Sequence, residues 1–423
     1  MNPALLRIYH SLPLPLRSLA ASARGRQLRR WRYGADSERL VQEALEREQW
    51  SAAQWQEWRT ARLALVLERA ARRVPYYREM WAQRRRKGER ASWQYLENWP
   101  VLEKQTLRAQ APAFVADDCT RPKMFHDHTS GTTGTSLDIW LSRATVQRWY
   151  ALFEARSRRW YGVSRYDHWG LLGGQLVTPA TQTRPPFWVW NSALNQLYLS
   201  AYHLAPAWAG SYLEALQHYR IRYLVGYPSA LYYLAREAQR LGQTGVRLTV
   251  VIANAEPLLA HQRAAISDAF QCPVRETYGM AEIAAAASEC EHGKLHQWPE
   301  AGLVETLGAD GANHETSGDF ICTGLLNADM PLIRYRIGDS GAWAPPSFPP
   351  GPESNRRATR AVMPAPLPKR AVARRTISPP THRGRCMRSR KFSGTRTIPS
   401  ARPIFIWIGP STVRPRLRAC VCF

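Results

Sequence analysis

The sequence predicts a layered α/β fold, preceded by a helical segment and followed by a tail of different composition. Between residues 123 and 345, short apolar runs alternate with amphipathic stretches, as strands and helices do in a layered sheet. Residues 37–87 carry apolar side chains at spacings near three and four, which indicates helices. We therefore expect a helical region over 1–100, an α/β core over 101–340 and a separate tail over 341–423.

The composition is that of a globular protein. The chain has 423 residues, 45% hydrophobic and 22% charged, enough for two or three domains. No apolar run reaches the roughly 18 residues of a membrane-spanning helix, so we expect no transmembrane segment. Pro13, Pro15 and Arg17 interrupt the first apolar stretch, which argues against a secretion signal. The seven cysteines are scattered and odd in number, so we expect reduced thiols and a cytoplasmic location.

The elements follow from these patterns in chain order. A basic N-terminal arm leads into a long helical pattern that Pro75 interrupts, and we interpret the many aromatic residues there as core packing. Strand and helix patterns alternate from residue 168 onward. Ligands in such sheets bind at the carboxyl ends of strands, so the loops after the strands are where a site is expected. The expected strands are His168–Leu172, Tyr223–Val225, Leu248–Ala253, Val274–Thr277, Leu303–Glu305 and Phe320–Cys322, and the expected helices are Trp208–Tyr219, Ser229–Leu241 and His261–Phe270.

The positive charge is concentrated in the tail. Residues 341–423 hold 17 of the 58 Lys and Arg residues and one acid, Glu353, and so carry 16 of the net charge of +25. They also hold 14 of the 30 prolines and show no sustained period, which predicts disorder. The tail has few aromatic residues to stack on bases, so no nucleic-acid partner is expected. The alternative is a non-catalytic nucleotide-binding or scaffold protein whose basic tail docks on nucleic acid or an anionic membrane.

The loop of residues 129–135 has the composition of a phosphate-binding loop. Its two glycines leave the backbone free to curl, and its threonines and serine offer hydroxyls and amides to anionic oxygens. No Gly-Lys-Ser/Thr follows, so it is not the Walker type. Taken alone, the segment also fits an ordinary polar turn.

Two further motifs give this loop a context. Thr277 to Glu282 reads Thr-Tyr-Gly-Met-Ala-Glu, and Arg334 to Asp339 reads Arg-Tyr-Arg-Ile-Gly-Asp. The three motifs in this order resemble the signature motifs of the adenylate-forming superfamily of acyl-CoA synthetases. More narrowly, residues 1–345 resemble the phenylacetate-CoA ligase-like branch, which includes the capsule-associated CapK proteins. The supporting stretches are Val74–Arg78, Trp99–Lys104, Gly226–Ala230 and Ala253–Pro257.

The resemblance implies an AMP-forming ligase. Such an enzyme activates a carboxylic acid, aromatic or otherwise apolar, with ATP and passes the acyl group to coenzyme A. Thr132, Thr133 and Glu282 would be catalytic, with Glu282 coordinating Mg²⁺ beside the phosphates. Tyr278 would stack on adenine, and Asp339 would accept hydrogen bonds from the ribose hydroxyls. The implied nucleotide-binding residues are Thr129, Ser130, Gly131, Thr132, Thr133, Gly134, Thr135, Ala255, Glu256, Pro257, Tyr278, Gly279, Met280 and Asp339.

The same residues have plainer interpretations. Asp339 also fits a turn after a strand, and Glu282 also fits a surface acid. The acyl pocket is expected between Trp169–Gly174 and Tyr227–Ser229, whose aromatic side chains suit many apolar acids. The sequence carries no signal for the particular acid or for an oligomeric state.

The chain departs from the family pattern near the nucleotide. Ala281 stands where the family usually has threonine, and no lysine follows Gly134. Some relatives bind zinc through a pair like Cys290 and His296 together with two cysteines soon after the Gly-Asp pair. No cysteine lies between residues 322 and 386, so we expect an incomplete zinc site, or simply a buried thiol and a surface imidazole.

The tail is the largest departure from the family. Family members continue after the Gly-Asp pair into a small C-terminal domain that supplies a lysine to adenylation. Only Lys369 and Lys391 follow Gly341, and neither has a recognisable Gly-Lys context. We therefore expect this small domain to be missing. The abrupt change to Arg/Pro-rich sequence suggests a frameshift, which reading the coding DNA in the other frames would test.

Overall fold

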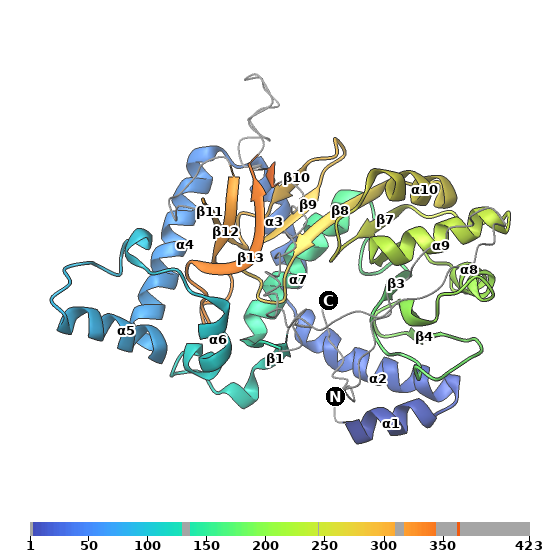
Figure 1. Ribbon diagram of the computed structural model, residues 1–423, viewed down its shortest axis with the longest axis horizontal. Coiled ribbons are helices and arrows are strands. Elements are labelled where there is room, and N and C mark those ends of the chain that lie inside the picture. Colours follow the sequence, from blue (N-terminus) through green and yellow to red (C-terminus); the bar gives the residue numbers. More distant parts are fainter. Residues whose placement is uncertain (1–2, 129–135, 244, 309–316, 344–361, 364–423) are drawn as a thin grey trace, which may run out of the picture. The chain divides into compact units, whose positions relative to one another are not determined.

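A large mixed sheet organises the fold. The computed structural model describes residues 3–128, 136–243, 245–308, 317–343 and 362–363. Within these residues the sheet has nine strands in the order β14-β10-β9-β8-β7-β6-β3-β5-β4 (Figure 1). Strands β5, β3, β6, β7 and β8 run parallel, and antiparallel strands extend both edges. The strands are β3 (Trp169–Gly173), β4 (Trp188–Asn191), β5 (Gln196–Ser200), β6 (Tyr223–Gly226), β7 (Val250–Ala253), β8 (Val274–Gly279), β9 (Ala286–Glu289), β10 (Leu295–Gln297) and β14 (Val362–Met363).

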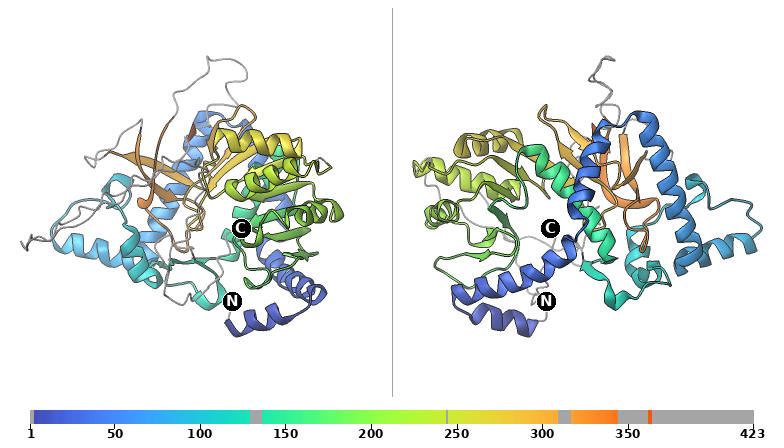
Figure 2. Two further views of the ribbon diagram at one scale, coloured as in Figure 1. Left: turned by 45° about the vertical axis from the view of Figure 1, so that its right-hand side comes forward. Right: turned by 180° about the vertical axis from the view of Figure 1, so that it is seen from behind.

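The central strands are buried along their whole length. Every residue of β3, β6 and β7 is buried, as expected of parallel strands covered on both faces. Helices α8 (Ala209–His218), α9 (Pro228–Arg240) and α10 (Ala260–Phe270) share a hydrophobic cluster with one face of the sheet (Figures 1 and 2). The predicted alternation of strands and helices over residues 168–279 is therefore confirmed.

Helix α9 shows how the sequence builds this layer. Proline at its first position suits a helix start, where the missing N–H is not needed. Its buried side chains recur at spacings of three and four and face the core: Leu231, Leu234, Ala235 and Ala238. The strand before it ends at Gly226, where a Cβ would lie 2.5 Å from the carbonyl oxygen of Leu172. Glycine is thus the residue that lets β6 approach β3 at this end.

Two smaller sheets complete the β structure. A hairpin of β1 (Phe125–His128) and β2 (Asp138–Leu141) brackets residues 129–135, and β11 (Gly302–Leu307), β12 (Ser317–Gly324) and β13 (Tyr335–Ala342) form an antiparallel sheet. Strand β13 carries the Tyr-Arg-x-Gly-Asp motif. The predicted strands at 303–305 and 320–322 are confirmed as parts of β11 and β12.

The N-terminal helices pack into the same core as part of the α/β region. Side chains from α3, α4 and α5 join one hydrophobic cluster with α7 and strand β12. Serine 51 caps α4 and forms a reciprocal capping box with Gln54. Pro75 ends that helix pattern as expected and occupies the first position of α5. The helices are α1 (Pro3–Ser11), α2 (Leu14–Arg32), α3 (Ser37–Glu46), α4 (Ala52–Arg73), α5 (Pro75–Arg86), α6 (Lys104–Gln110) and α7 (Arg143–Ser157).

The described part of the tail is short. Strand β13 continues to Ala342, and Val362–Met363 form β14, which pairs with β10. This two-residue strand was not expected from a segment without periodicity. The disorder expected over 341–423 and the boundary at residue 100 stay predictions. Among the described helices, none combines the length and apolarity that crossing a membrane requires.

Candidate functional site

Two crossed hydrogen bonds join the Tyr-Gly motif, residues 277–282, to the Tyr-Arg-x-Gly-Asp motif, residues 335–339. The hydroxyl of Tyr278, on β8, donates to Oδ2 of Asp339 at 2.9 Å. The hydroxyl of Tyr335, on β13, donates to Oε1 of Glu282 at 3.0 Å. Each motif therefore supplies a tyrosine to the carboxylate of the other, although the two tyrosines lie in different sheets. The structure thus brings Tyr278, Glu282 and Asp339 together.

Glu282 is a buried carboxylate rather than a surface acid. It is 6% exposed, and its Oε1 also lies 3.3 Å from Nζ of Lys104. Burial, followed by the negative charge of Glu282, raises the pKa of Tyr335 well above its ordinary value. The Tyr335 phenol therefore stays protonated and donates to the carboxylate.

Lys104 contacts Glu282, although the sequence motifs gave this lysine no role in the site. It occupies the first turn of α6, where a cation faces the positive end of the helix dipole. That position is unfavourable for lysine unless a nearby anion compensates, and Glu282 is such an anion. Its place at the end of the supporting stretch Trp99–Lys104 was the available signal.

The geometry around Asp339 depends on the residue before it. Gly338 has a φ of 92°, a conformation that residues with a Cβ rarely adopt. It lies within β13 directly before Asp339.

Burial, with a further contribution from Asp339, raises the pKa of Tyr278 far above its ordinary value, so this hydroxyl also acts as a donor.

A cavity of about 130 Å³ lies beside the Tyr-Gly motif. It receives residues from β1, β2, α7, β8 and the loop after β7. Its wall is mostly apolar, with Asp127 and the buried Arg32 as its charged members. The guanidinium of Arg32 lies 4.5 Å from the centre of the Tyr150 ring. The lining residues are Arg32, Phe125, Asp127, Leu141, Val146, Trp149, Tyr150, Phe153, Ser157, Asn254, Ala255, Thr277, Tyr278, Gly279, Met280, Ala281, Ile283 and Trp298.

Asp127 has an unusual environment for a carboxylate. Burial raises its pKa to about 6, while the backbone N–H of His128 and the charge of Arg32 oppose that increase. The His128 N–H donates to Oδ1 of Asp127 at 2.9 Å. A carboxylate whose pKa is raised by burial therefore lies in the cavity wall.

The predicted nucleotide-binding residues separate into three groups. Ala255, Tyr278, Gly279 and Met280 line the cavity. Glu256 accepts from the backbone N–H of Ser229 at 3.0 Å, and Glu256, Pro257 and Asp339 are not among the lining residues. Thr129, Ser130, Gly131, Thr132, Thr133, Gly134 and Thr135 lie outside the described residues.

The expected acyl pocket differs from the cavity next to the motifs. Trp169–Gly174 and Tyr227–Ser229 are not among its lining residues. Trp169, Leu171 and Leu172 instead fill the two cores of the sheet. The walls of the cavity come from α7 and the β1–β2 hairpin, which sequence periodicity did not connect to the Tyr-Gly motif.

Cys290 and His296 are the two residues that the sequence suggested as zinc ligands. Cys290 and His296 are both buried, so the expectation of a surface imidazole at His296 was wrong. His296 lies on β10. Among the described residues, no third histidine, cysteine or acid joins them at metal-ligand distance. These residues alone therefore do not fit a structural zinc site, which takes four ligands.

Known proteins share this fold and part of this sequence. No family model matches the chain. CapK of Staphylococcus aureus is 27% identical over 272 residues, covering 63% of this chain and 58% of CapK. Phenylacetate-coenzyme A ligase of Aromatoleum evansii is 24% identical over 307 residues, covering 68% of this chain and 66% of the ligase. The chain therefore spans less than two thirds of the length of either relative.

Solved structures identify the fold. 2-Hydroxyisobutyryl-CoA ligase in a postadenylation state matches with a TM-score of 0.55 and 18% identity, covering 76% of this chain and 68% of that chain. The same ligase with 2-HIB-AMP and CoA matches with a TM-score of 0.54 and 19% identity, covering 76% and 69%. The fold is that of the adenylate-forming acyl-CoA ligases. In sequence, the chain is similar to CapK and to phenylacetate-CoA ligase.

Proposed function

We propose that the protein activates a small carboxylic acid with ATP and transfers the acyl group to coenzyme A. The observation that carries this proposal is the crossed pair of hydrogen bonds, Tyr278 to Asp339 and Tyr335 to Glu282. These bonds hold two carboxylates of suitable chemistry for ribose and for a cation beside one apolar cavity. Phenylacetate-CoA ligase, as a relative in sequence, supports the same class of reaction.

The first proposed step forms an acyl-adenylate. A carboxylate oxygen of the acid attacks the α-phosphorus of ATP, and the bond from that phosphorus to the pyrophosphate oxygen breaks. Both reactants are anions, so the protein acts by positioning them and by offsetting negative charge. We assign phosphate contacts to Thr132 and Thr133, the ribose hydroxyls to Asp339, and the adenine face to Tyr278.

The surroundings of Glu282 fit the Mg²⁺ that accompanies ATP. This ion usually binds one or two protein carboxylates and completes its shell with water and substrate phosphates. Among the described residues, Tyr335 and Lys104 both contact Oε1, which leaves Oε2 for an ion. A bound Mg²⁺ supplies charge neutralisation at the phosphates. The ammonium of Lys104 adds positive charge at the same carboxylate.

The second proposed step transfers the acyl group. The coenzyme A thiolate attacks the carbonyl carbon of the adenylate, and the bond from that carbon to the phosphate oxygen breaks, which releases AMP. A structure with the same fold, 2-hydroxyisobutyryl-CoA ligase, binds 2-HIB-AMP and CoA together. That observation supports coenzyme A as the acceptor in our proposal.

The size of the cavity favours a small acid. A volume of about 130 Å³ is close to the roughly 150 Å³ of an engineered cavity that admits one benzene ring. We therefore expect an aryl group or a short branched chain to fit better than a long fatty chain. Phe125, Trp149 and Phe153 supply the apolar contacts that such a group requires.

The proposal is tested by exchange of labelled pyrophosphate into ATP on the full chain. We expect exchange that depends on the added acid and is faster with phenylacetate or benzoate than with palmitate. Glu282→Gln should lose most of that exchange while still folding, since glutamine preserves the shape of the side chain. ATP binding without acid-dependent exchange would contradict the proposal and support the non-catalytic, nucleotide-binding alternative.

A further inference from the structure

The β1–β2 hairpin has two faces with different chemistry. Its register pairs His126 with Trp140 and His128 with Asp138. Because side chains alternate along a strand, these four residues share one face. The opposite face carries Phe125, Asp127, Ile139 and Leu141: Ile139 is buried and the other three line the cavity. The histidine face is therefore separate from the wall of the proposed acyl pocket.

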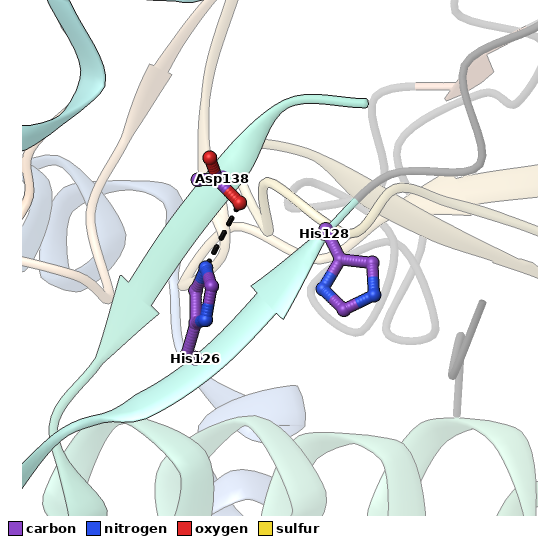
Figure 3. Close-up of side chains that lie close together, drawn as sticks. All are labelled: His126, His128 and Asp138. Atoms are coloured by element: carbon purple, nitrogen blue, oxygen red, sulfur yellow. Dashed lines mark hydrogen bonds and ion pairs between the residues drawn. The ribbon is translucent and has the colours of Figure 1, made fainter. Parts of the chain in front are cut away.

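Three potential metal ligands gather on the histidine face. One ligand atom each from His126, His128 and Asp138 lies within 4.8 Å of the other two. Nε2 of His126 is 2.9 Å from Oδ1 of Asp138, and Figure 3 shows these two side chains meeting between the strands, with His128 beside them. The hydrogen bond to Asp138 involves only His126. A second imidazole directly opposite the same carboxylate completes a three-ligand set.

The distances suit a small divalent ion after modest side-chain rotation. Tetrahedral coordination at about 2.0–2.1 Å from each ligand places the ligand atoms roughly 3.3 Å apart. His126 and Asp138 are each 48% exposed, so both side chains have room to close the remaining gap. The imidazole of His126 also stacks on Trp140, with centroids 4.9 Å apart and ring planes 7° apart, which orients the ring.

We propose that His126, His128 and Asp138 bind a divalent transition-metal ion of the Zn²⁺, Co²⁺ and Ni²⁺ class. Two imidazoles and one carboxylate are donors that these ions accept, whereas Ca²⁺ and Mg²⁺ prefer oxygen ligands alone. Three protein ligands leave a coordination position open. The ion would link β1 to β2 at the end where the hairpin brackets residues 129–135. This site is independent of the proposed ligase activity.

The test is a titration of the chelator-treated full chain with Co²⁺, followed by its visible absorption. We expect one ion per chain at the hairpin. Losing even an outer partner of a metal ligand costs about 10- to 100-fold in affinity. His126→Ala, His128→Ala and Asp138→Asn should therefore each weaken binding by at least that much. Asp138→Asn changes an exposed side chain, so it keeps the test valid if a histidine variant folds poorly.

Two control variants separate this site from other metal ligands of the chain. His292→Ala removes an exposed histidine outside the hairpin, and Cys290→Ser removes the thiol once considered for zinc. Both should bind Co²⁺ at the hairpin as the parent does. Zn²⁺ should also raise the melting temperature of the parent and not that of Asp138→Asn, by linkage of binding to folding. Unchanged Co²⁺ binding in all three hairpin variants, or no binding by the parent, would overturn the proposal.

Discussion

Replacing Asp339 with alanine should weaken MgATP binding and also lower stability. In the folded protein, the carboxylate accepts from Tyr278 at 2.9 Å, and in the proposed complex it also accepts from ribose hydroxyls. Tyr278→Phe removes the same bond between the two motifs but keeps the carboxylate. The two variants therefore share one structural defect and differ in the group that would hold the ribose.

The expected magnitudes follow from these contacts. A hydrogen bond to a charged group contributes about 1.5–3 kcal/mol, so each variant should lose about that much free energy of unfolding. Asp339→Ala additionally loses the ribose hydroxyls, at least about 3 kcal/mol for two bonds. Since 1.4 kcal/mol corresponds to a factor of ten, its Kd for MgATP should rise roughly 100-fold. For Tyr278→Phe, which retains the ring, the Kd should change less than about tenfold.

Isothermal calorimetry of MgATP and urea unfolding, both on the full chain, measure the two effects separately. Full retention of MgATP affinity in Asp339→Ala would refute our placement of the nucleotide. Equal losses of affinity in Asp339→Ala and Tyr278→Phe would show that Asp339 acts only by holding Tyr278.

Three further predictions follow from other parts of the structure. Glu154→Gln should lower the free energy of unfolding by about 3–5 kcal/mol in urea titrations, because it leaves the buried Arg158, 3.1 Å away, without its counter-ion. Ala281→Thr should tighten MgATP binding by up to about tenfold in calorimetry, because a hydroxyl returns beside the cavity and one hydrogen bond contributes about 0.5–1.5 kcal/mol. Burial lowers the pKa of His203 in the folded protein. Its contribution to stability is therefore present above the pKa of the unfolded chain, about 6.5, and is lost as the pH falls through the lower pKa of the folded protein. His203→Gln should therefore lose less stability than the parent between pH 7 and pH 5 in urea unfolding.

Local patterns predicted the central layers of the fold because those elements are uniformly apolar or periodic. Strand β7 is an uninterrupted apolar run, and α9 repeats apolar residues every three or four positions, so neither requires knowledge of distant partners. Strands β1, β2, β9 and β10 have three or four residues each. Unlike β7, these strands also contain polar or charged residues, so they depend on their neighbours in the sheet and the sequence carries little signal for them.

The site was predictable only where motifs mark it. Tyr278, Glu282 and Asp339 were proposed as site residues from their motifs, whereas the contact of Lys104 with Glu282 joins residues 178 positions apart in the printed sequence. The contribution of Arg32 to the cavity likewise depends on α2 reaching the β1 and α7 walls. Long-range packing sets such contacts, and a single sequence does not encode them in any local pattern.

The proposed reaction requires one site that binds the AMP part and the small acyl part of the adenylate together. Its most direct test is calorimetric binding of a non-reactive phenylacetyl-adenylate analogue, with a sulfamate in place of the phosphate, to the full chain. Because the analogue occupies the ribose site and the cavity at once, it should bind at least about 100-fold more tightly than AMP or phenylacetate alone. Asp339→Ala should remove most of that advantage. Binding no tighter than that of AMP, or binding unaffected by Asp339→Ala, would contradict the claim.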